Sequence, residues 1–343
     1  MITFRKPSKL LLIALMGINC STLVAQSILD DLKQNTSFGG YVIGQVSATD
    51  QESSSKKVDM NLRLARLYID SRIGDFVFKL QMQLSGNTSS LSSPRIVDAW
   101  AEWQHWKELR IKFGQMKRPF TFENPMHPWL IGKGNYSQLA LKMAGFNDRT
   151  GEHASNGRDF GLQLQGDLFP IGLDRHRLLH YQVGVFTGQG INFSDRNTRK
   201  DVIGGLWIAP IRELQIGAFA WTGNYVNDAK QTIERRRLSF GANYNGNWTA
   251  RAEYALDNAN GKADAWYAVV GTPSWKRTKL FARYDVYREG KTFDNSKSMY
   301  GASIQHQLYM NLMFQFNYDY NVVKSTAGKQ RYSTFDLQAY WRF

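Results

Sequence analysis

The sequence contains very little cysteine and proline: one cysteine, Cys20, and eight prolines among 343 residues. A single cysteine can form neither an intramolecular disulfide nor a cysteine-based zinc site. The longest apolar run, residues 10–17, is much shorter than the roughly 20 residues that a helix needs to cross a bilayer. These absences exclude a disulfide framework, a cysteine zinc module and a helical integral membrane protein.

The N-terminal residues carry the features of a secretory signal. Basic residues at positions 5, 6 and 9 precede the apolar run, and residues 23–25 (Leu-Val-Ala) form a suitable cleavage site. We therefore expect a signal peptide over residues 1–25 and an N-terminal periplasmic segment over residues 26–37. A short buried helix is the alternative for the apolar run.

The rest of the sequence is rich in aromatic residues (13%), carries an excess of positive charge, and alternates with a period of two. For example, Leu312, Phe314 and Phe316 alternate with Met313, Gln315 and other mostly polar residues. Successive residues of a strand face opposite sides of the sheet, so each such segment has an apolar face and a polar face. A soluble β-sandwich shows the same alternation, so one segment alone does not decide the fold.

Sixteen such segments follow residue 37, most of them about 10–13 residues long, whereas strands of soluble proteins usually have about 5–6 residues. An even number of strands is typical of bacterial outer-membrane barrels. The expected strands are 38–48, 60–71, 75–85, 96–105, 108–117, 158–169, 178–187, 200–209, 213–222, 232–245, 247–257, 262–271, 277–288, 297–306, 309–320 and 331–343.

Short and long connections alternate along the chain. Residues 72–74 and 211–212 are tight links, whereas residues 49–59 and 321–330 are long ones. Outer-membrane barrels have short periplasmic turns and long external loops, and a sheet can cross lipid only when it closes on itself. We therefore predict an all-β chain: a 16-stranded antiparallel transmembrane β-barrel over residues 38–343, located in the outer membrane, with a water-filled lumen.

Three connecting segments carry a family resemblance. Residues 113–125 read FGQMKRPFTFENP, residues 157–164 read GRDFGLQL, and residues 186–201 read FTGQGINFSDRNTRKD. In their order and their placement relative to the strands, these segments resemble the phosphate-selective porin O and P family. The resemblance implies a barrel that is usually trimeric and conducts anions, in some members phosphate. It also implies that the third long loop folds inward between Lys117 and Arg158.

This third loop is the expected constriction of the pore. From Lys117 to Arg158 the sequence has six basic and three acidic residues. An inward loop would place the excess positive charge where the pore is narrow and the electric field is strong. The predicted constriction and anion-binding residues are Lys117, Arg118, Lys133, Lys142, Arg149 and Arg158. A solvated external loop, with its charges facing water or lipopolysaccharide, is the alternative.

The wall of the lumen is expected to be nearly neutral, because the polar faces of the strands carry ten basic and nine acidic residues. The basic residues that we predict to line this wall include Lys79, Lys112, Arg237, Arg251 and Arg283. Selectivity is therefore expected to come mainly from the loop.

These observations predict a passive diffusion channel for small anions such as phosphate, with weak to moderate anion preference. A substrate-specific uptake channel for a sugar or a carboxylate and a non-conducting structural barrel are the alternatives. The expected partners are outer-membrane lipid, lipopolysaccharide, small anionic solutes and further copies in a homotrimer.

Other chemistries have little support in the sequence. His127 and His153 lie in the same loop as two serines, but nothing indicates the oriented third group that a hydrolase needs. His176 and His180 have a spacing that suits zinc only on a helix, and a turn entering a strand is expected there. We expect no catalytic residues, no cofactor, no metal site and no nucleic-acid partner.

Overall fold

The computed structural model describes residues 34–86 and 94–343. Within them, sixteen antiparallel strands form one continuous sheet, and β1 pairs with both β2 and β16, so the sheet is a closed barrel. This confirms the predicted architecture. The expected signal peptide, residues 1–25, lies outside the described residues. The strands are β1 Thr36–Thr49, β2 Val58–Ile73, β3 Phe76–Gly86, β4 Arg95–Trp103, β5 Arg110–Lys117, β6 Arg158–Ile171, β7 His176–Phe186, β8 Asp201–Ile211, β9 Leu214–Val226, β10 Thr232–Asn245, β11 Thr249–Asp257, β12 Ala263–Gly271, β13 Thr278–Glu289, β14 Ser296–Tyr309, β15 Leu312–Ser325 and β16 Gly328–Arg342.

The alternation of the sequence separates the two faces of the barrel. On β15, Phe314 and Phe316 are exposed on the outer face, whereas Gln315 and Asn317 are buried on the inner face. The outer face can therefore meet lipid while polar side chains surround the lumen. In the part of the chain that the structure describes, no helix has the length and apolar character of a membrane span.

One connection differs from its prediction. Residues 321–330 were expected to form a long loop, but β15 continues to Ser325 and β16 begins at Gly328. Val322 pairs with Arg331 and Ser325 with Gly328, which leaves only a two-residue hairpin turn. The polar residues here continue the strand alternation beyond the apolar band, so a change in composition was mistaken for the end of the strand.

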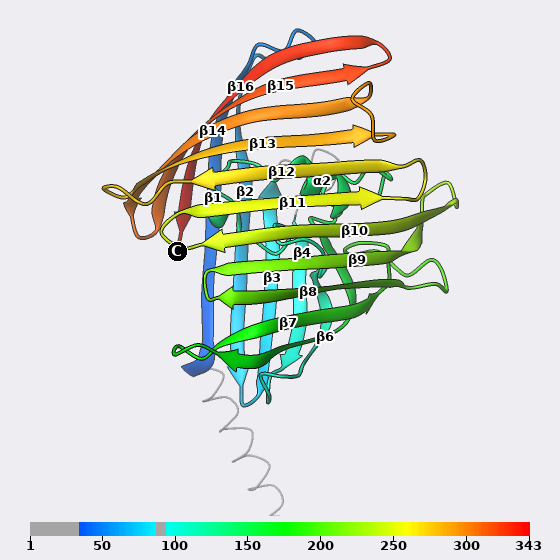
Figure 1. Cartoon of the computed structure of the whole chain (residues 1–343), viewed down its shortest axis with the longest axis vertical. Helices are drawn as coiled ribbons and strands as arrows, with labels where there is room; N and C mark the ends of the chain where they lie inside the picture. The colour runs from blue at the N-terminus through cyan, green and yellow to red at the C-terminus, as the bar shows by residue number, and fades with distance from the viewer. Residues whose placement is uncertain (1–33, 87–93) are drawn as a thin grey trace, which may run out of the picture.

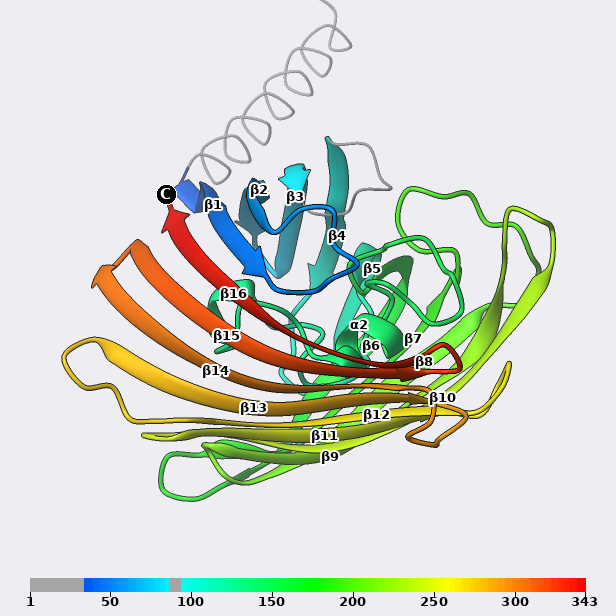
Figure 2. The same cartoon turned by 90° about the horizontal axis from the view of Figure 1, so that it is seen from above.

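The front and back walls of the barrel run steeply across each other: β6–β14 lie nearly horizontal in Figure 1, and β1–β4 lie behind them nearly vertical. Strands that tilt relative to the axis of a barrel produce this crossing. The segment 118–157 between β5 and β6 contains a 3-10 turn, η1 (Pro128–Leu130), and a short helix, α2 (Gln138–Met143). Figure 2 shows α2 within the curve of the strands.

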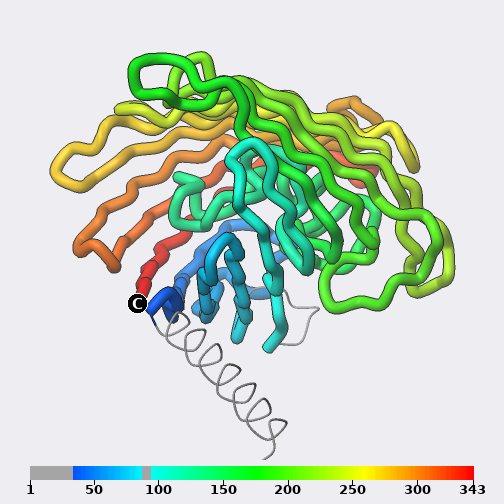
Figure 3. Tube along the Cα trace, turned by 90° about the horizontal axis from the view of Figure 1, so that it is seen from below, coloured from blue at the N-terminus to red at the C-terminus, as the bar shows by residue number. Residues whose placement is uncertain are grey.

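We call residues 118–157 the inner loop, because its side chains pack on the inner face of the barrel. Phe120, Phe122 and Leu139 are buried in one apolar cluster with Phe219 and Trp221 of β9. The helix α2 contacts β11, β12 and β13. The loop therefore packs against the wall formed by β8–β13. Figure 3 shows its trace crossing the interior.

Candidate functional site

Two of the cavities that border the inner loop lie mainly toward β1–β4 and β14–β16. The outer cavity, about 270 Å³, includes Lys297 and Thr334 near the strand ends that carry the long loops. The inner cavity, about 500 Å³, includes Lys79 and Lys112, which lie toward the short turns. Both cavities are lined by Arg66, Pro128 and Tyr136. We call these three residues the neck, because they border both cavities.

Arg66, on β2, brings a buried cation to the neck, and its partners are neutral. Its guanidinium donates to the Tyr41 hydroxyl oxygen at 3.0 Å and to Oε1 of Gln83 at 3.0 Å. It forms no ion pair with any carboxylate in the described residues. Neutral acceptors fix its position without cancelling its charge.

Lys117, at the end of β5, is a second basic side chain whose hydrogen-bond partners are neutral. Its ammonium donates to the Asn156 carbonyl at 3.0 Å and to Oδ1 of Asn124 at 3.3 Å, and it lies 4.6 Å from the centre of the Phe146 ring. Like Arg66, it has no carboxylate partner among the described residues. Lys117 lines the inner cavity, and its ammonium lies 5.5 Å from the centre of the ring of Tyr136, a neck residue.

The pKa of His127, in the inner loop, reflects the positive charge around it. Burial, the largest cause, and the nearby cations Arg66, Arg342 and Lys79 together lower the pKa of His127 to about 4. Its ring packs edge-on against Tyr41 at 4.4 Å between centroids. The imidazole is therefore neutral near pH 7.

Arg63 extends the positive charge into the outer cavity. It donates to the Tyr340 hydroxyl at 3.2 Å and to Oε1 of Gln338 at 3.5 Å, both neutral acceptors. Two carboxylates, Asp319 and Asp336, line the same cavity. The outer cavity is therefore of mixed charge, whereas the neck is positive.

Two of the six predicted constriction residues instead attach the inner loop to the wall. Arg118 pairs with Glu152 at 2.6 Å and with Asp159 at 2.9 Å, and all three side chains are fully buried. Arg149 pairs with Asp257 at 3.2 Å and also with Glu289.

The remaining predicted constriction residues are dispersed. Lys133 is buried and pairs with Asp319 at 2.7 Å. Arg158 lines the inner cavity but pairs with Asp98 at 2.8 Å. Lys142 lies near the end of α2, where burial and the neighbouring Lys297 lower its pKa. Of the six predicted residues, Lys117 is the one that the structure places beside the neck without a carboxylate partner among the described residues.

The predicted wall residues fall into two groups. Lys79 pairs with Asp70 at 2.6 Å, and Lys112 lies 3.7 Å from Glu102 and 3.8 Å above the Trp100 ring; both lysines line the inner cavity.

The three wall arginines hold the inner loop. Arg237 pairs with Asp148 at 2.7 Å, Arg251 donates to the Ile131 carbonyl at 3.0 Å, and Arg283 donates to the Asn135 carbonyl at 2.7 Å. These arginines therefore attach the loop to the wall from β10, β11 and β13.

The sequence reasoning missed Arg63 and Arg66. Alternation would place residues 63 and 66 on opposite faces, yet both are buried on the inner face. The register of β1 and β2 shifts between Ile43 and Gly44, so that Arg63 has no partner across the ladder. Such a bulge reverses the phase of the strand. The available signal was the phase change of apolar residues in this strand, from Leu62 and Leu64 to Leu67 and Ile69.

Comparisons with known proteins agree with this architecture. The sequence model of the family described as phosphate-selective porin O and P matches residues 40–255. Among curated proteins, no sequence matches this chain. An anion-selective porin from Comamonas acidovorans superposes with a TM-score of 0.70 at 12% identity, covering 90% of this chain and 99% of its own. The outer-membrane channel DcaP of Acinetobacter baumannii superposes with a TM-score of 0.60 at 12% identity, covering 90% and 97%. OprB of Pseudomonas putida gives 0.61 at 11% identity, covering 93% and 96%.

Proposed function

Because this chain belongs to the phosphate-selective porin O and P family, and is therefore an outer-membrane β-barrel channel, we propose that it passes small solutes by diffusion with a preference for anions. Inorganic phosphate is among the solutes that we expect to pass. The family and the fold are those of a channel rather than of an enzyme.

The observation that carries this proposal is the pair of basic side chains at and beside the neck, Arg66 and Lys117. Both Arg66 and Lys117 are hydrogen-bonded by neutral acceptors, and neither forms a direct ion pair with a carboxylate of the described residues. A charge beside a narrow aqueous path acts on every ion that passes, and low-dielectric walls focus its field. Anions are attracted and cations repelled at the same point.

The neck cations also differ in kind, which suits oxyanions. A guanidinium presents several donors in a plane and matches carboxylate or phosphate oxygens, whereas an ammonium is a compact point charge. One of each at a constriction can bind an oxyanion transiently without the permanent pairing that a fixed carboxylate would impose. We assign the anion preference to Lys117 and Arg66, and an anchoring role to Arg118, Lys133 and Arg149; Arg158 of β6 is neutralised by Asp98 of β4.

The test is electrical. Purified barrels in a planar bilayer are expected to give open channels and, in a KCl gradient, a reversal potential of the sign that chloride permeation produces. A cation-selective reversal potential would refute the proposal. Single-channel conductance near zero would instead support a structural barrel whose lumen is filled by the inner loop.

A second candidate, an uptake channel for organic anions, is favoured by the aromatic side chains of the inner cavity. Tyr68, Trp100 and Trp129 line it beside cations, and Arg342 lies 4.1 Å above the Trp129 ring. Aromatic faces next to cations suit a flat organic acid. Saturable block of chloride current by benzoate, but not by acetate, would favour this candidate; equal effects would favour general diffusion.

A homotrimer remains part of the proposal. The support comes from the family resemblance and from a structural neighbour whose title describes a trimer form, OmpT of Vibrio cholerae. The homotrimer is tested by measuring the mass of the purified protein in detergent by light scattering. A monomeric mass would contradict it.

A further inference from the structure

A second group of cations lies on the outer face of the barrel, away from the pore. Lys324 of β15 lies opposite Lys329 of β16, and Val322 lies opposite Arg331. Residues two apart in a strand share a face, so Lys324 points to the same side as Tyr320. These three cations line an outer groove of about 650 Å³ together with Tyr284, Phe293, Ser296, Ser298, Tyr300 and Tyr320.

The charge of this outer groove is not neutralised. No carboxylate is among its lining residues. Within residues 34–86 and 94–343, none of Lys324, Lys329 and Arg331 forms an ion pair. Asp264 on the adjoining β12 is already held by Arg288 at 2.6 Å. Three positive charges therefore face outward, and no carboxylate of the described residues pairs with them.

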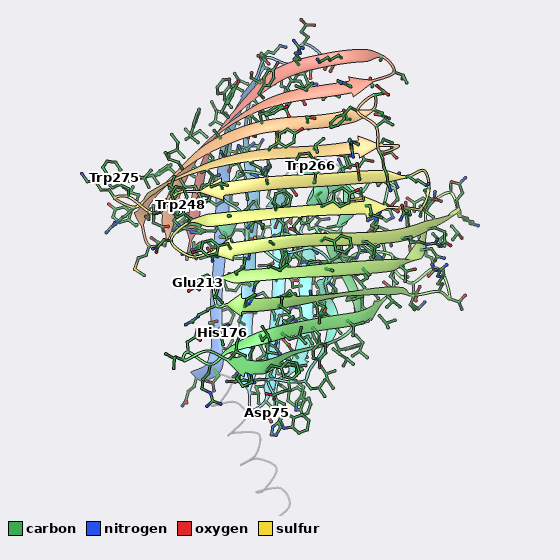
Figure 4. The ribbon with its side chains drawn as sticks, viewed as in Figure 1. Asp75, His176, Glu213, Trp248, Trp266 and Trp275 are labelled. Carbon is green, nitrogen blue, oxygen red and sulfur yellow. The ribbon has the colours of Figure 1, made fainter. Side chains whose placement is uncertain are left out.

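The depth of the groove in the membrane follows from the aromatic residues beside it. Trp266, Tyr284, Tyr300 and Tyr320 form a row across β12–β15, with ring centroids 4.8, 4.8 and 6.5 Å apart in turn. Rows of aromatic residues mark the two membrane–water interfaces of such barrels. Figure 4 shows Trp266 toward the long-loop end, opposite Trp248 and Trp275 at the short-turn end.

Lys324 follows Tyr320 by four residues and lies nearer the long loops. At about 3.3 Å per residue this is roughly 13 Å along the strand. Lys329, opposite Lys324, lies at the same level, and Arg331, opposite Val322, lies about half as far beyond Tyr320. The three cations therefore lie beyond the aromatic row, at the depth of the lipid headgroups, and the long-loop side of such a barrel faces outward. The row itself borders the acyl chains.

We propose that the outer groove binds the phosphorylated headgroup of an acylated glycolipid of the outer leaflet, the lipid A part of lipopolysaccharide. The phosphate lies among Lys324, Lys329 and Arg331, where charge-assisted hydrogen bonds form with both kinds of cation. The acyl chains descend along Tyr300 and Tyr320. A zwitterionic lipid gives the groove no net charge to match, so the site favours the phosphorylated glycolipid.

The test uses the purified, delipidated full barrel and measures binding of lipopolysaccharide in detergent by native mass spectrometry. Lys324, Lys329 and Arg331 are replaced together by glutamine. Each charge near an anionic lipid surface contributes about fivefold to affinity, so the triple variant is expected to bind roughly a hundredfold more weakly. The matched control replaces Lys107, Arg212 and Lys276 at the short-turn end, which removes the same charge and is expected to leave binding unchanged.

Three further outcomes would overturn the proposal. Equal binding of lipid A from which the phosphates have been removed would show that charge is not recognised. Equally tight binding of inorganic phosphate would show that the lipid is not needed. A changed oligomeric state in the triple variant, with lipopolysaccharide binding intact, would make the groove a contact between copies of the chain. Unchanged single-channel conductance of the triple variant verifies that it is folded, because the lumen is untouched.

Discussion

The two sides of the inner loop use the same residue types for opposite purposes. On the side facing β8–β13, Arg118 and Arg237 are buried and paired with carboxylates. On the open side, Arg66 and Lys117 are held by hydroxyl, amide and carbonyl oxygens. A cation beside a carboxylate attaches the loop, whereas a cation beside neutral acceptors keeps its charge for a passing ion. The position of the acidic residues, more than that of the basic ones, separates structure from selectivity.

The largest effect, a loss of stability, is expected from breaking the Arg237–Asp148 ion pair on the anchored side of the loop. Arg237→Met leaves Asp148 buried without its main partner, and removing one member of a buried ion pair typically costs about 3–5 kcal/mol. We expect a lower midpoint in urea-dependent unfolding and noisier channels, since the loop is released. The control is Arg236→Met, an exposed neighbour on the same strand. Equal midpoints for the two variants would contradict the anchoring role.

The contribution of the Arg237–Asp148 ion pair to the free energy of unfolding should be constant over a wide range of pH. Burial raises the pKa of Asp148, but the Arg237 guanidinium outweighs it and leaves the pKa well below its usual range. A carboxylate with a depressed folded pKa stabilises the protein above its unfolded pKa of about 4, and this contribution is lost as the pH falls further. We expect the difference in unfolding free energy between wild type and Asp148→Asn to be constant from pH 8 to 5 and to shrink below about 4. A difference that already shrinks between pH 8 and 6 would be inconsistent with this pairing.

Adjacent residues on the two sides of the loop give the sharpest comparison. Lys117→Gln is expected to lower the ratio of chloride to potassium permeability by at least about threefold, the effect of one charge roughly 6 Å from the ion in water. Arg118→Gln is expected to destabilise the barrel but to leave the permeability ratio nearly unchanged. Reversal potentials and unfolding midpoints of both variants check this. The reverse pattern would place the filter on the anchored side.

Arg63 should have a smaller effect than Lys117. It faces the outer cavity, where Asp319 and Asp336 offset part of its field. Arg63→Gln is therefore expected to reduce anion preference by less than Lys117→Gln does, measured in the same salt gradient. A larger reduction would move the constriction toward the long loops.

The smallest expected effect on anion preference comes from the titration of His127. With a pKa of about 4 it is neutral from pH 8 to 5 and gains charge below about pH 4. We expect anion preference to rise at the acidic end, and this rise to be smaller in His127→Ala. Carboxylates that titrate in the same range act in both proteins, so the difference between them reports on His127. Identical pH profiles would rule out a role for this side chain.

The fold could be predicted from the sequence because barrel strands carry a repeating physical signal. Every strand must show lipid an apolar face, so residues such as Phe314 and Phe316 mark it directly. The signal fails where the chain leaves the apolar band, as at residues 321–330, and where a bulge shifts its phase, as at Arg63.

The site could be predicted only in part. The sequence indicated the segment that enters the barrel, and Lys117 in it. It could not indicate which cations are neutralised, because the partners of Arg118 and Arg149 are 34–140 residues away in the chain. Ion pairs between residues so far apart in the chain depend on the closed barrel. A count of the charges along the loop therefore cannot predict them.

The most direct test of this account is the reversal potential of the double variant Arg66→Gln/Lys117→Gln in a KCl gradient, with Lys262→Gln/Lys291→Gln in the external loops as the control. Two charges at the neck are expected to change the permeability ratio by roughly tenfold, removing the anion preference, while the control behaves as wild type. If the double variant keeps the wild-type reversal potential with an intact barrel, the neck is not the filter.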